Sequence, residues 1–136
     1  MDGAIHNAAG PGLLDECRRL GGCATGKAKI TGGHGLPARY VIHTVGPIYR
    51  GGTRGEAELL RSCYRESLRL AAESKLGSIA FPCISTGAYG YPAQEACDLA
   101  VAVVTQWVST HELPAKVIFC CFQPDDARLY RARLRG

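Results

Sequence analysis

The stretch SIAFPCISTGAYGYPAQEACDLAV, residues 78–101, determines the fold class. It passes from an apolar run typical of a buried strand into a glycine- and hydroxyl-rich loop, and then into a helical pattern. In open α/β sheets ligands bind beyond the carboxyl ends of the strands, which is where the loop STGAYGYP (85–92) is expected. Its glycines allow successive backbone N–H groups to converge on an anion, Ser85 and Thr86 offer hydroxyl donors, and the next helix adds its dipole. The stretch therefore predicts either a phosphate-binding loop or a plain strand-to-helix turn.

Outward from this stretch, the rest of the chain alternates between the same two patterns. Strands are expected at 27–31, 39–45, 78–85 and 116–122, and helices at 11–20, 56–75, 93–111 and 124–135. The last three strand candidates are continuous apolar runs, typical of strands covered by helices on both faces. This pattern predicts an α/β layered domain.

The composition fits one domain spanning residues 1–136. A hydrophobic content of 46% in 136 residues allows one modest core. The net charge of +4, with basic residues concentrated in RLYRARLRG (128–136), suits an anionic ligand. No basic stripe interleaved with aromatic residues accompanies this charge, so the charge does not require a nucleic-acid ligand. The C-terminal arginines also fit the solvated face of a C-terminal helix.

The seven cysteines form an odd set without any CxxC motif. Cys83, Cys120 and Cys121 lie in apolar runs, where a reduced thiol acts as a small core hydrophobe. This usage predicts a reducing, cytoplasmic location. Cys and His do not recur at zinc-site spacings, so no structural metal is expected. The longest apolar runs are strand-sized and no signal peptide opens the chain, which predicts a soluble protein that is not exported.

Two motifs resemble catalytic signatures but lack their context. Residues 21–27 fit GxxxxGK, but Ala28 stands where a Walker motif needs Ser or Thr. Ser85, Asp98 and His111 follow hydrolase chain order. However, Asp98 and His111 fall in one helix about 20 Å apart, so they cannot both serve one serine.

Three further features remain open on local chemistry. We expect His43, within a strand, to be a hydrogen-bonded core residue and not a catalyst. Phe122 ends the last strand at the same edge of the sheet as Ser85, where it can stack on a base or belong to the core. The segment GGTRGE (51–56) is the best candidate for a mobile surface loop.

Two long blocks, MDGAIHNAAGPGLLDECRRLGGCATGKAKITGGHGLPARYVIHTVGP (1–47) and IAFPCISTGAYGYP (79–92), resemble a macrodomain of the MacroD type, the family that binds ADP-ribose. The resemblance runs from residue 1 to about residue 130. It implies a three-layer fold with a mixed sheet flanked by helices on both faces. In that family the ISTGxxGYP loop wraps the diphosphate.

The resemblance also implies roles for individual residues. The diphosphate and the distal ribose would be held by Ser85, Thr86, Gly87, Ala88, Tyr89 and Gly90. Tyr89 would cover the distal ribose, and Phe122 falls where the family places an aromatic beside the adenine. Asp2 matches the acidic residue that helps to position the attacking water, and His6 follows it by one helical turn.

The chain departs from the family at its N-terminus. An edge strand, an acidic residue for the adenine amine, an interior strand ending in NAAN and a glycine-rich loop precede DGAIH in the family and are not present in this sequence. We therefore expect an N-terminally truncated domain in which Met1 is an internal methionine of a longer reading frame. The strands at 39–45 and 78–85 would then keep unpaired edges, which predicts direct closure of the gap, or dimerisation and aggregation, with reduced stability. Asp2 would be frayed and poorly preorganised for catalysis.

The function that follows from the resemblance is ADP-ribose binding. It includes hydrolysis of mono-ADP-ribosyl esters on acidic side chains, deacetylation of O-acetyl-ADP-ribose, or both, without a metal or redox cofactor. The expected partners are ADP-ribose or O-acetyl-ADP-ribose, mono-ADP-ribosylated proteins, and further copies of the chain through exposed strand edges, but no membrane. The alternatives are a non-catalytic ADP-ribose-binding module, since the asparagine segment is absent, and, less favoured, an RNA-binding module using the basic C-terminus.

Overall fold

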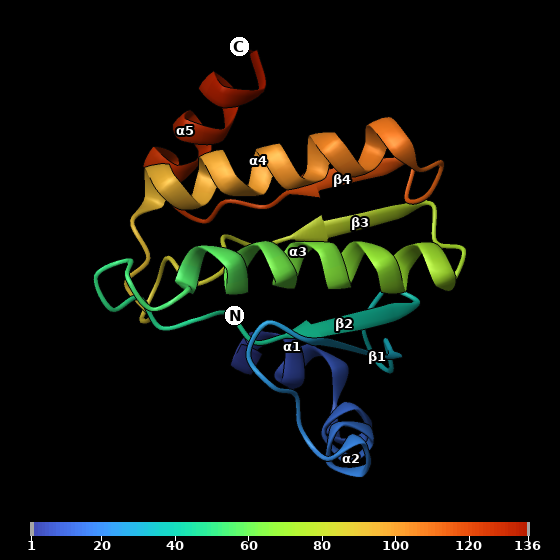
Figure 1. Ribbon diagram of the computed structural model, residues 1–136. Helices are drawn as coiled ribbons and strands as arrows, with labels where there is room; N and C mark the ends of the chain where they lie inside the picture. Colours follow the sequence, from blue (N-terminus) through green and yellow to red (C-terminus); the bar gives the residue numbers. More distant parts are fainter. Residues whose placement is uncertain (1, 136) are drawn as a thin grey trace.

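The computed structural model describes the backbone of residues 2–135 and the side chains of residues 4–135 (Figure 1). Its helices are α1 (Asp2–Ala9), α2 (Pro11–Leu20), α3 (Glu56–Glu73), α4 (Ala93–Thr110) and α5 (Pro124–Arg135). Its strands are β1 (Ala28–Gly32), β2 (Tyr40–Thr44), β3 (Ser78–Phe81) and β4 (Lys116–Phe119). No helix within this described part is long and apolar enough to span a membrane.

Glycine and proline set the helix ends. Gly10, with φ 85°, separates α1 from α2, and Pro11 opens α2 where its missing N–H costs nothing. Gly21 closes α2 in the left-handed conformation, with its N–H donating to the carbonyl of Arg18 at 3.1 Å. The helices predicted at 11–20 and 124–135 are confirmed to the residue, and the other two within two residues at each end.

The described strands form two separate two-stranded sheets. β1 and β2 are antiparallel, in a register from Ala28↔Thr44 to Gly32↔Tyr40. β3 and β4 are parallel, from Ser78↔Lys116 to Phe81↔Phe119. β3 ends earlier than predicted because Pro82 follows Phe81 and has no N–H to donate to a ladder.

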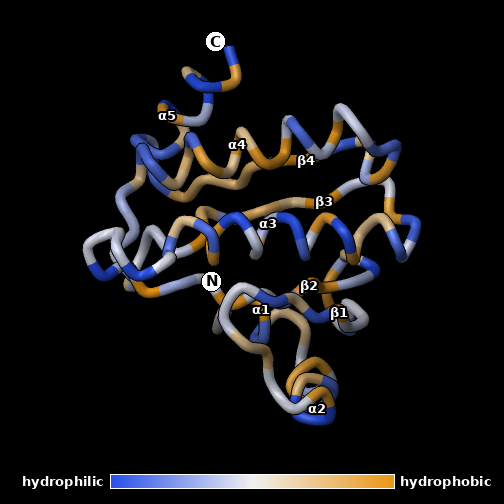
Figure 2. Tube along the Cα trace, viewed as in Figure 1, coloured by the Kyte–Doolittle hydropathy of each residue, from blue (hydrophilic) through white to orange (hydrophobic). Residues whose placement is uncertain are grey.

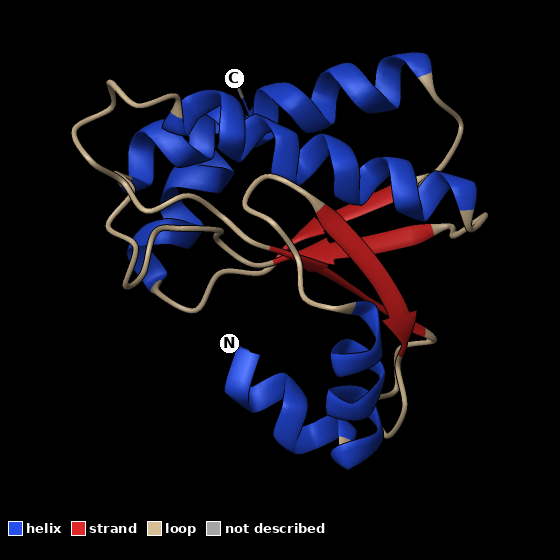
Figure 3. Cartoon of the chain, turned by 60° about the horizontal axis from the view of Figure 1, so that its bottom comes forward, coloured by secondary structure: helices blue, strands red, loops and turns tan. Residues whose placement is uncertain are grey.

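The helices lie on both sides of the strands. α3 contacts β1, β2 and β3 and packs against α4, while α2 contacts β1 (Figure 3). On the β3–β4 sheet, however, alternate residues are open to solvent, including Ser78, Ala80 and the 41% exposed Ile118. The expectation that both faces of these strands are covered is therefore wrong for the β3–β4 sheet.

The main hydrophobic core lies between α3, α4, α5 and the β3–β4 sheet. Tyr64 of α3 packs on Phe81, and Tyr130 of α5 packs on Phe119, each pair with ring centroids 4.9 Å apart. Figure 2 shows hydrophobic colour along β3 and through α4. Of the side chains that the structure describes, none in this core, and none packed against its edge, precedes Tyr49 in the sequence. The N-terminal elements are therefore held outside the main core.

The cysteines divide between core and surface. Cys63 and Cys97 are fully buried, in helices that form the core. Cys83 and Cys121 are half-buried, but Cys120 is exposed, so the prediction that it acts as a core hydrophobe is wrong. Its position between two inward-facing residues at a strand end turns its side chain outward.

Among the described residues, β2 and β3 are each hydrogen-bonded on one edge only, to β1 and β4 respectively. The predicted unpaired edges are thus confirmed, and the alternative of direct closure between these two strands is wrong. Figure 1 shows β2 and β3 running in the same direction, with α3 between them in this view. Because α3 contacts both β2 and β3, it connects the two sheets.

Candidate functional site

The loop from Ser85 to Gly90 forms two tight turns directly after β3. The N–H of Gly90 donates to the carbonyl of Gly87 at 3.0 Å, and the N–H of Tyr91 donates to the carbonyl of Ser85 at 2.9 Å. The hydroxyl of Thr86 donates to the carbonyl of Cys83 at 3.1 Å. Gly90, the last residue of the Gly87–Gly90 turn, adopts φ 72°, a left-handed conformation that glycine tolerates without strain. Gly90 therefore shapes the loop, and its N–H is not available as the ligand donor that the sequence suggested.

Other donors of the same loop have no protein acceptor. Among the backbone of residues 2–135 and the side chains of residues 4–135, no acceptor takes a hydrogen bond from the N–H of Ser85, Gly87, Ala88 or Tyr89. The hydroxyl of Ser85 is buried and also has no partner. Ser85 adopts φ 66°, a left-handed conformation that non-glycine residues seldom adopt and that the surrounding structure must support. An acceptor-rich anion would satisfy these donors together.

The segment after β2 meets this loop directly. A Cβ on Gly46 would lie 2.1 Å from the hydroxyl oxygen of Ser85, so only glycine allows the approach. The N–H of Tyr49 donates to the carbonyl of Tyr89 at 2.8 Å, and the rings of Tyr49 and Tyr91 lie 4.9 Å apart, edge to face. The site thus forms where the carboxyl ends of β2 and β3 converge. The sequence motifs did not identify Gly46 and Tyr49 as part of the site, although the VGP at 45–47 marks the end of the strand predicted at 39–45.

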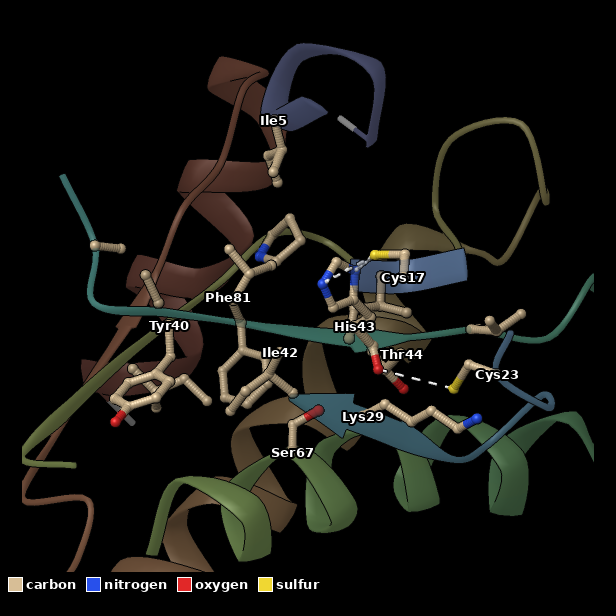
Figure 4. A pocket seen from close by; sticks show the side chains of 18 of the residues that line it. Ile5, Cys17, Cys23, Lys29, Tyr40, Ile42, His43, Thr44, Ser67 and Phe81 are labelled. Carbon is tan, nitrogen blue, oxygen red and sulfur yellow. Dashed lines mark hydrogen bonds between the residues drawn. The ribbon is translucent and has the colours of Figure 1, made fainter. Parts of the chain in front are cut away.

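A groove of about 830 Å³ runs from this convergence back between β2 and β3. Figure 4 draws side chains that line it, among them Ile42 from β2 and Phe81 from β3. Ser85 and Tyr89 line its end at the loop. The groove is therefore bounded by the two unpaired strand edges and opens onto the free donors.

Two histidines lie beside the groove. The ring of His43 lies 2.9 Å from the hydroxyl oxygen of Thr31. It also lies 3.7 Å from the sulfur of Cys17 (Figure 4). The prediction that His43 is hydrogen-bonded is confirmed. His6 lines the groove, with its ring centroid 6.4 Å from that of His43. Asp2 begins α1, but its side chain lies outside the described residues, so its position relative to His6 stays a prediction.

The two aromatics predicted to contact the ligand are both at the surface. Tyr89 is 41% exposed and lines the groove. Phe122 is 74% exposed, three residues beyond the end of β4, so its placement as a core aromatic is wrong. It lines neither the groove nor the second cavity described next.

A second cavity of about 360 Å³ shares Tyr89 with the groove and is also lined by Arg50, Arg54 and Glu56. The buried Glu56 carboxylate accepts hydrogen bonds from the backbone N–H groups of Arg50, Gly52 and Arg54 at 2.6–2.9 Å. These bonds lower the pKa of Glu56 to about 2, with the Arg50 amide contributing most. In the segment 51–56, predicted to be a mobile loop, residues 51–55 are exposed, but their backbone is tied to the buried Glu56 carboxylate.

The described side chains contain no group of three or more His, Cys, Asp or Glu residues placed to hold a metal ion. What the site offers is a set of unsatisfied amides and a hydroxyl, with arginines nearby. This combination recognises an oxyanion with several acceptor oxygens.

Comparison with known proteins places this arrangement in context. The Macro domain family model matches residues 1–100. The macro domain-containing protein CT2219 of Chlorobaculum tepidum is 57% identical over 134 residues, covering 98% of this chain and 78% of that protein. The ADP-ribose glycohydrolase MACROD2 of Mus musculus is 51% identical, over 98% of this chain and 29% of that protein.

Solved structures agree with the fold. The Oceanobacillus iheyensis macrodomain with ADP has a TM-score of 0.93 and 41% identity, over 98% of this chain and 74% of that one. The Trypanosoma brucei macrodomain in complex with ADP-ribose has a TM-score of 0.90 and 44% identity, over 98% of this chain and 56% of that one. The predicted α/β fold with helices around a mixed set of strands is thus confirmed.

Proposed function

The chain belongs to the Macro domain family, and from this premise we propose that it binds ADP-ribose at the loop of residues 85–90. The observation that carries the proposal is the set of donors without acceptors. Four backbone N–H groups and the buried hydroxyl of Ser85 lie in one loop at the carboxyl end of β3. A diphosphate carries enough acceptor oxygens to satisfy them all.

The residues around this loop suggest where the distal ribose and the adenine of the ligand bind. The distal ribose lies under the half-exposed ring of Tyr89, which lines the groove. The adenine lies towards Phe122, whose exposed ring is free to close on a base. Related macrodomains were solved with ADP and with ADP-ribose, which supports this choice of ligand.

Calorimetry with ADP-ribose tests binding, and adenosine, which lacks the diphosphate, is the matched control ligand. We expect ADP-ribose to bind at least about a hundredfold more tightly, because the loop donors recognise the phosphates (about 2.7 kcal/mol). Equal binding of the two ligands, or no binding of ADP-ribose, rejects the proposed site. A steep salt dependence without competition by ADP-ribose would instead support RNA binding.

We further propose turnover of the bound ligand. Asp2, at the start of α1, would orient a water, with His6 one turn later and the loop amides stabilising developing charge. The substrates would be mono-ADP-ribosyl esters on acidic side chains or O-acetyl-ADP-ribose. Relatives named ADP-ribose glycohydrolase support this reaction class.

The alternative is a module that binds ADP-ribose without turning it over. Release of ADP-ribose from a mono-ADP-ribosylated protein, measured beside calorimetry, separates the two. Asp2→Asn is the diagnostic variant: lost release with retained affinity supports the hydrolase. Binding without release in the unaltered chain selects the binding module.

We also propose that two copies of the chain associate through the free edges of β2 and β3. Both edges border an apolar groove, and unpaired strand edges form hydrogen bonds with strands of other chains. Sedimentation of the protein over a range of concentrations tests this. A monomer at all concentrations would reject it.

A further inference from the structure

Two thiols face each other just before the proposed ligand loop, on the segments that follow β3 and β4. The sulfur atoms of Cys83 and Cys121 lie 3.8 Å apart. Each follows its strand by two residues, in the register that pairs Phe81 with Phe119. The N–H of Cys120 donates to the carbonyl of Phe81 at 2.7 Å, so strand pairing continues up to this point. The two cysteines thus occupy equivalent positions on neighbouring parallel segments.

From this geometry we propose that Cys83 and Cys121 form an oxidation site, a dithiol that small disulfides such as oxidised glutathione convert into an intramolecular disulfide. A disulfide needs its sulfur atoms about 2.05 Å apart. Both residues lie in irregular segments just outside the strands, so a small backbone shift is enough to bring the sulfur atoms together.

The reaction is thiol–disulfide exchange. One cysteine, as its thiolate, attacks a sulfur of oxidised glutathione, forms a mixed disulfide and releases one glutathione thiolate. The second cysteine thiolate then attacks the protein sulfur of that mixed disulfide and releases the other glutathione. The two protons lost by the cysteines end on the two glutathione thiols, and two electrons pass from the protein to the reagent.

The surroundings slow this exchange at neutral pH. Burial raises the pKa of the Cys83 thiol to about 12, with contributions from the facing Cys121, Asp126 and Cys97. Because the thiolate is the attacking species, we expect the closing rate to rise between pH 7 and pH 9. The pair therefore responds to sustained oxidation and stays reduced otherwise.

The disulfide would join two parts of the proposed ligand site. Cys83 lies two residues before Ser85, and Cys121 lies directly before Phe122. Closing the bond draws these segments together, while the hydroxyl of Ser85 already lies tightly against Gly46. We expect the oxidised protein to bind ADP-ribose about tenfold more weakly, because preorganised donors are displaced. This consequence rests on the proposed function, whereas the disulfide itself does not.

Peptide mapping tests the site without any ligand. Trypsin cleaves after Lys75, Lys116 and Arg128, so Cys83 and Cys121 fall in separate peptides, 76–116 and 117–128. After incubation of the full chain with oxidised glutathione, we expect these two peptides to be joined by a disulfide. The number of free thiols should fall by two. No joined peptide would overturn the proposal.

Matched variants identify the cysteines, because Cys97 shares a peptide with Cys83, and Cys120 shares one with Cys121. Cys83→Ala and Cys121→Ala should each abolish the joined peptide, whereas Cys97→Ala and Cys120→Ala should leave it. A joined peptide that disappears only in Cys97→Ala or Cys120→Ala would also overturn the proposal. Phenylarsine oxide, which bridges two close thiols without oxidation, should protect both Cys83 and Cys121 from alkylation in the folded protein.

Calorimetry on the reduced and the oxidised protein separates the two proposals. If the reduced protein does not bind ADP-ribose, the proposed function fails and the mapped disulfide stands. If both forms bind equally, the coupling between the disulfide and the ligand site is rejected.

Discussion

Gly87 tests the ligand site at the scale of a single residue. A Cβ at Gly87 meets no atom within 4 Å, and its φ lies outside the left-handed region, so larger residues fit the folded loop. In Gly87→Val the added methyl groups would occupy the space that the proposed diphosphate takes. We expect the dissociation constant for ADP-ribose to rise at least about tenfold, with the melting temperature within about 2 °C of the original. Calorimetry and thermal melting measure the two effects.

Gly46→Ala provides the contrast to Gly87→Val. Its Cβ would lie 2.1 Å from the hydroxyl oxygen of Ser85, so the loop itself must shift. This variant should lose both affinity and thermal stability. Unchanged affinity in a folded Gly87→Val protein would reject the assignment of the diphosphate to this loop.

Glu56 controls the acid stability of the adjoining loop. Its folded pKa, about 2, lies below the ordinary value of 4.5, because the charged form accepts three backbone N–H bonds. The resulting stability is present above pH 4.5 and is lost as the pH falls towards 2. Glu56→Gln keeps one side-chain oxygen for three donors, so its melting temperature at pH 7 should be lower by about 4 °C.

A pH series checks the sign of this effect. The difference in melting temperature between the two proteins should be constant from pH 7 to pH 5 and should shrink below pH 4.5. A difference that stays the same at pH 3 would mean that the Glu56 charge does not stabilise the loop.

Residue-scale prediction from sequence works for local chemistry and fails for long-range contacts. The Ser-Thr-Gly loop after the strand at 78–81 was recognisable because turn residues and donors are adjacent in the chain. The roles of Gly46 and Glu56 were not recognisable from the sequence. Gly46 matters because the chain there approaches Ser85 closely, and Glu56 matters because the preceding loop folds back onto its carboxylate. The loss of Gly90 as a donor likewise depends on a turn geometry that the sequence leaves open.

At the scale of elements, the free edge of β3 makes a prediction about association. Ala80 is exposed, lines the groove and lies beside the exposed Ile118 of β4. A lysine on an edge strand opposes pairing with another chain, because its charge would be buried. Ala80→Lys should therefore raise the dissociation constant of the proposed dimer at least about tenfold, as measured by sedimentation equilibrium.

The matched control is Ala102→Lys on the exposed surface of α4. It adds the same charge to the same chain, on a helix and not on either unpaired strand edge. If both variants dissociate the dimer equally, net charge and not the strand edge governs association.

The helices were predictable where glycine or proline residues adjacent in the sequence set their ends. Gly10, Pro11 and Gly21 mark the two ends of α2 in the sequence as in the structure. The buried face of α3 follows the helical spacing of apolar residues in its sequence. Whether one or both faces of the β3–β4 sheet are buried was not predictable from the sequence. A short apolar run such as 78–81 is compatible with either arrangement. The separation of β2 from β3 was expected only from the resemblance to a longer fold.

At the scale of the whole molecule, stability is unevenly distributed. The main core is built from residues between Tyr49 and Tyr130, on α3, α4, α5 and the β3–β4 sheet. The β1–β2 sheet is mostly half-buried, ends in an unpaired edge and reaches this core through α3. Segments with few buried apolar contacts open at lower free energy than the rest of a domain. The two parts of the chain should therefore unfold in two steps.

Native-state hydrogen exchange measures those steps. Amides of β1 and β2 should exchange at least about tenfold faster than those of α4, because they open without breaking the main core. Equal protection in both regions would mean that the chain unfolds as one unit.

Saturating ADP-ribose should raise the protection of β2 together with that of β3, by up to about 2.7 kcal/mol at a ligand concentration of a hundred times the dissociation constant. This coupling is expected because Gly46, after β2, and Ser85, after β3, meet at the same ligand site.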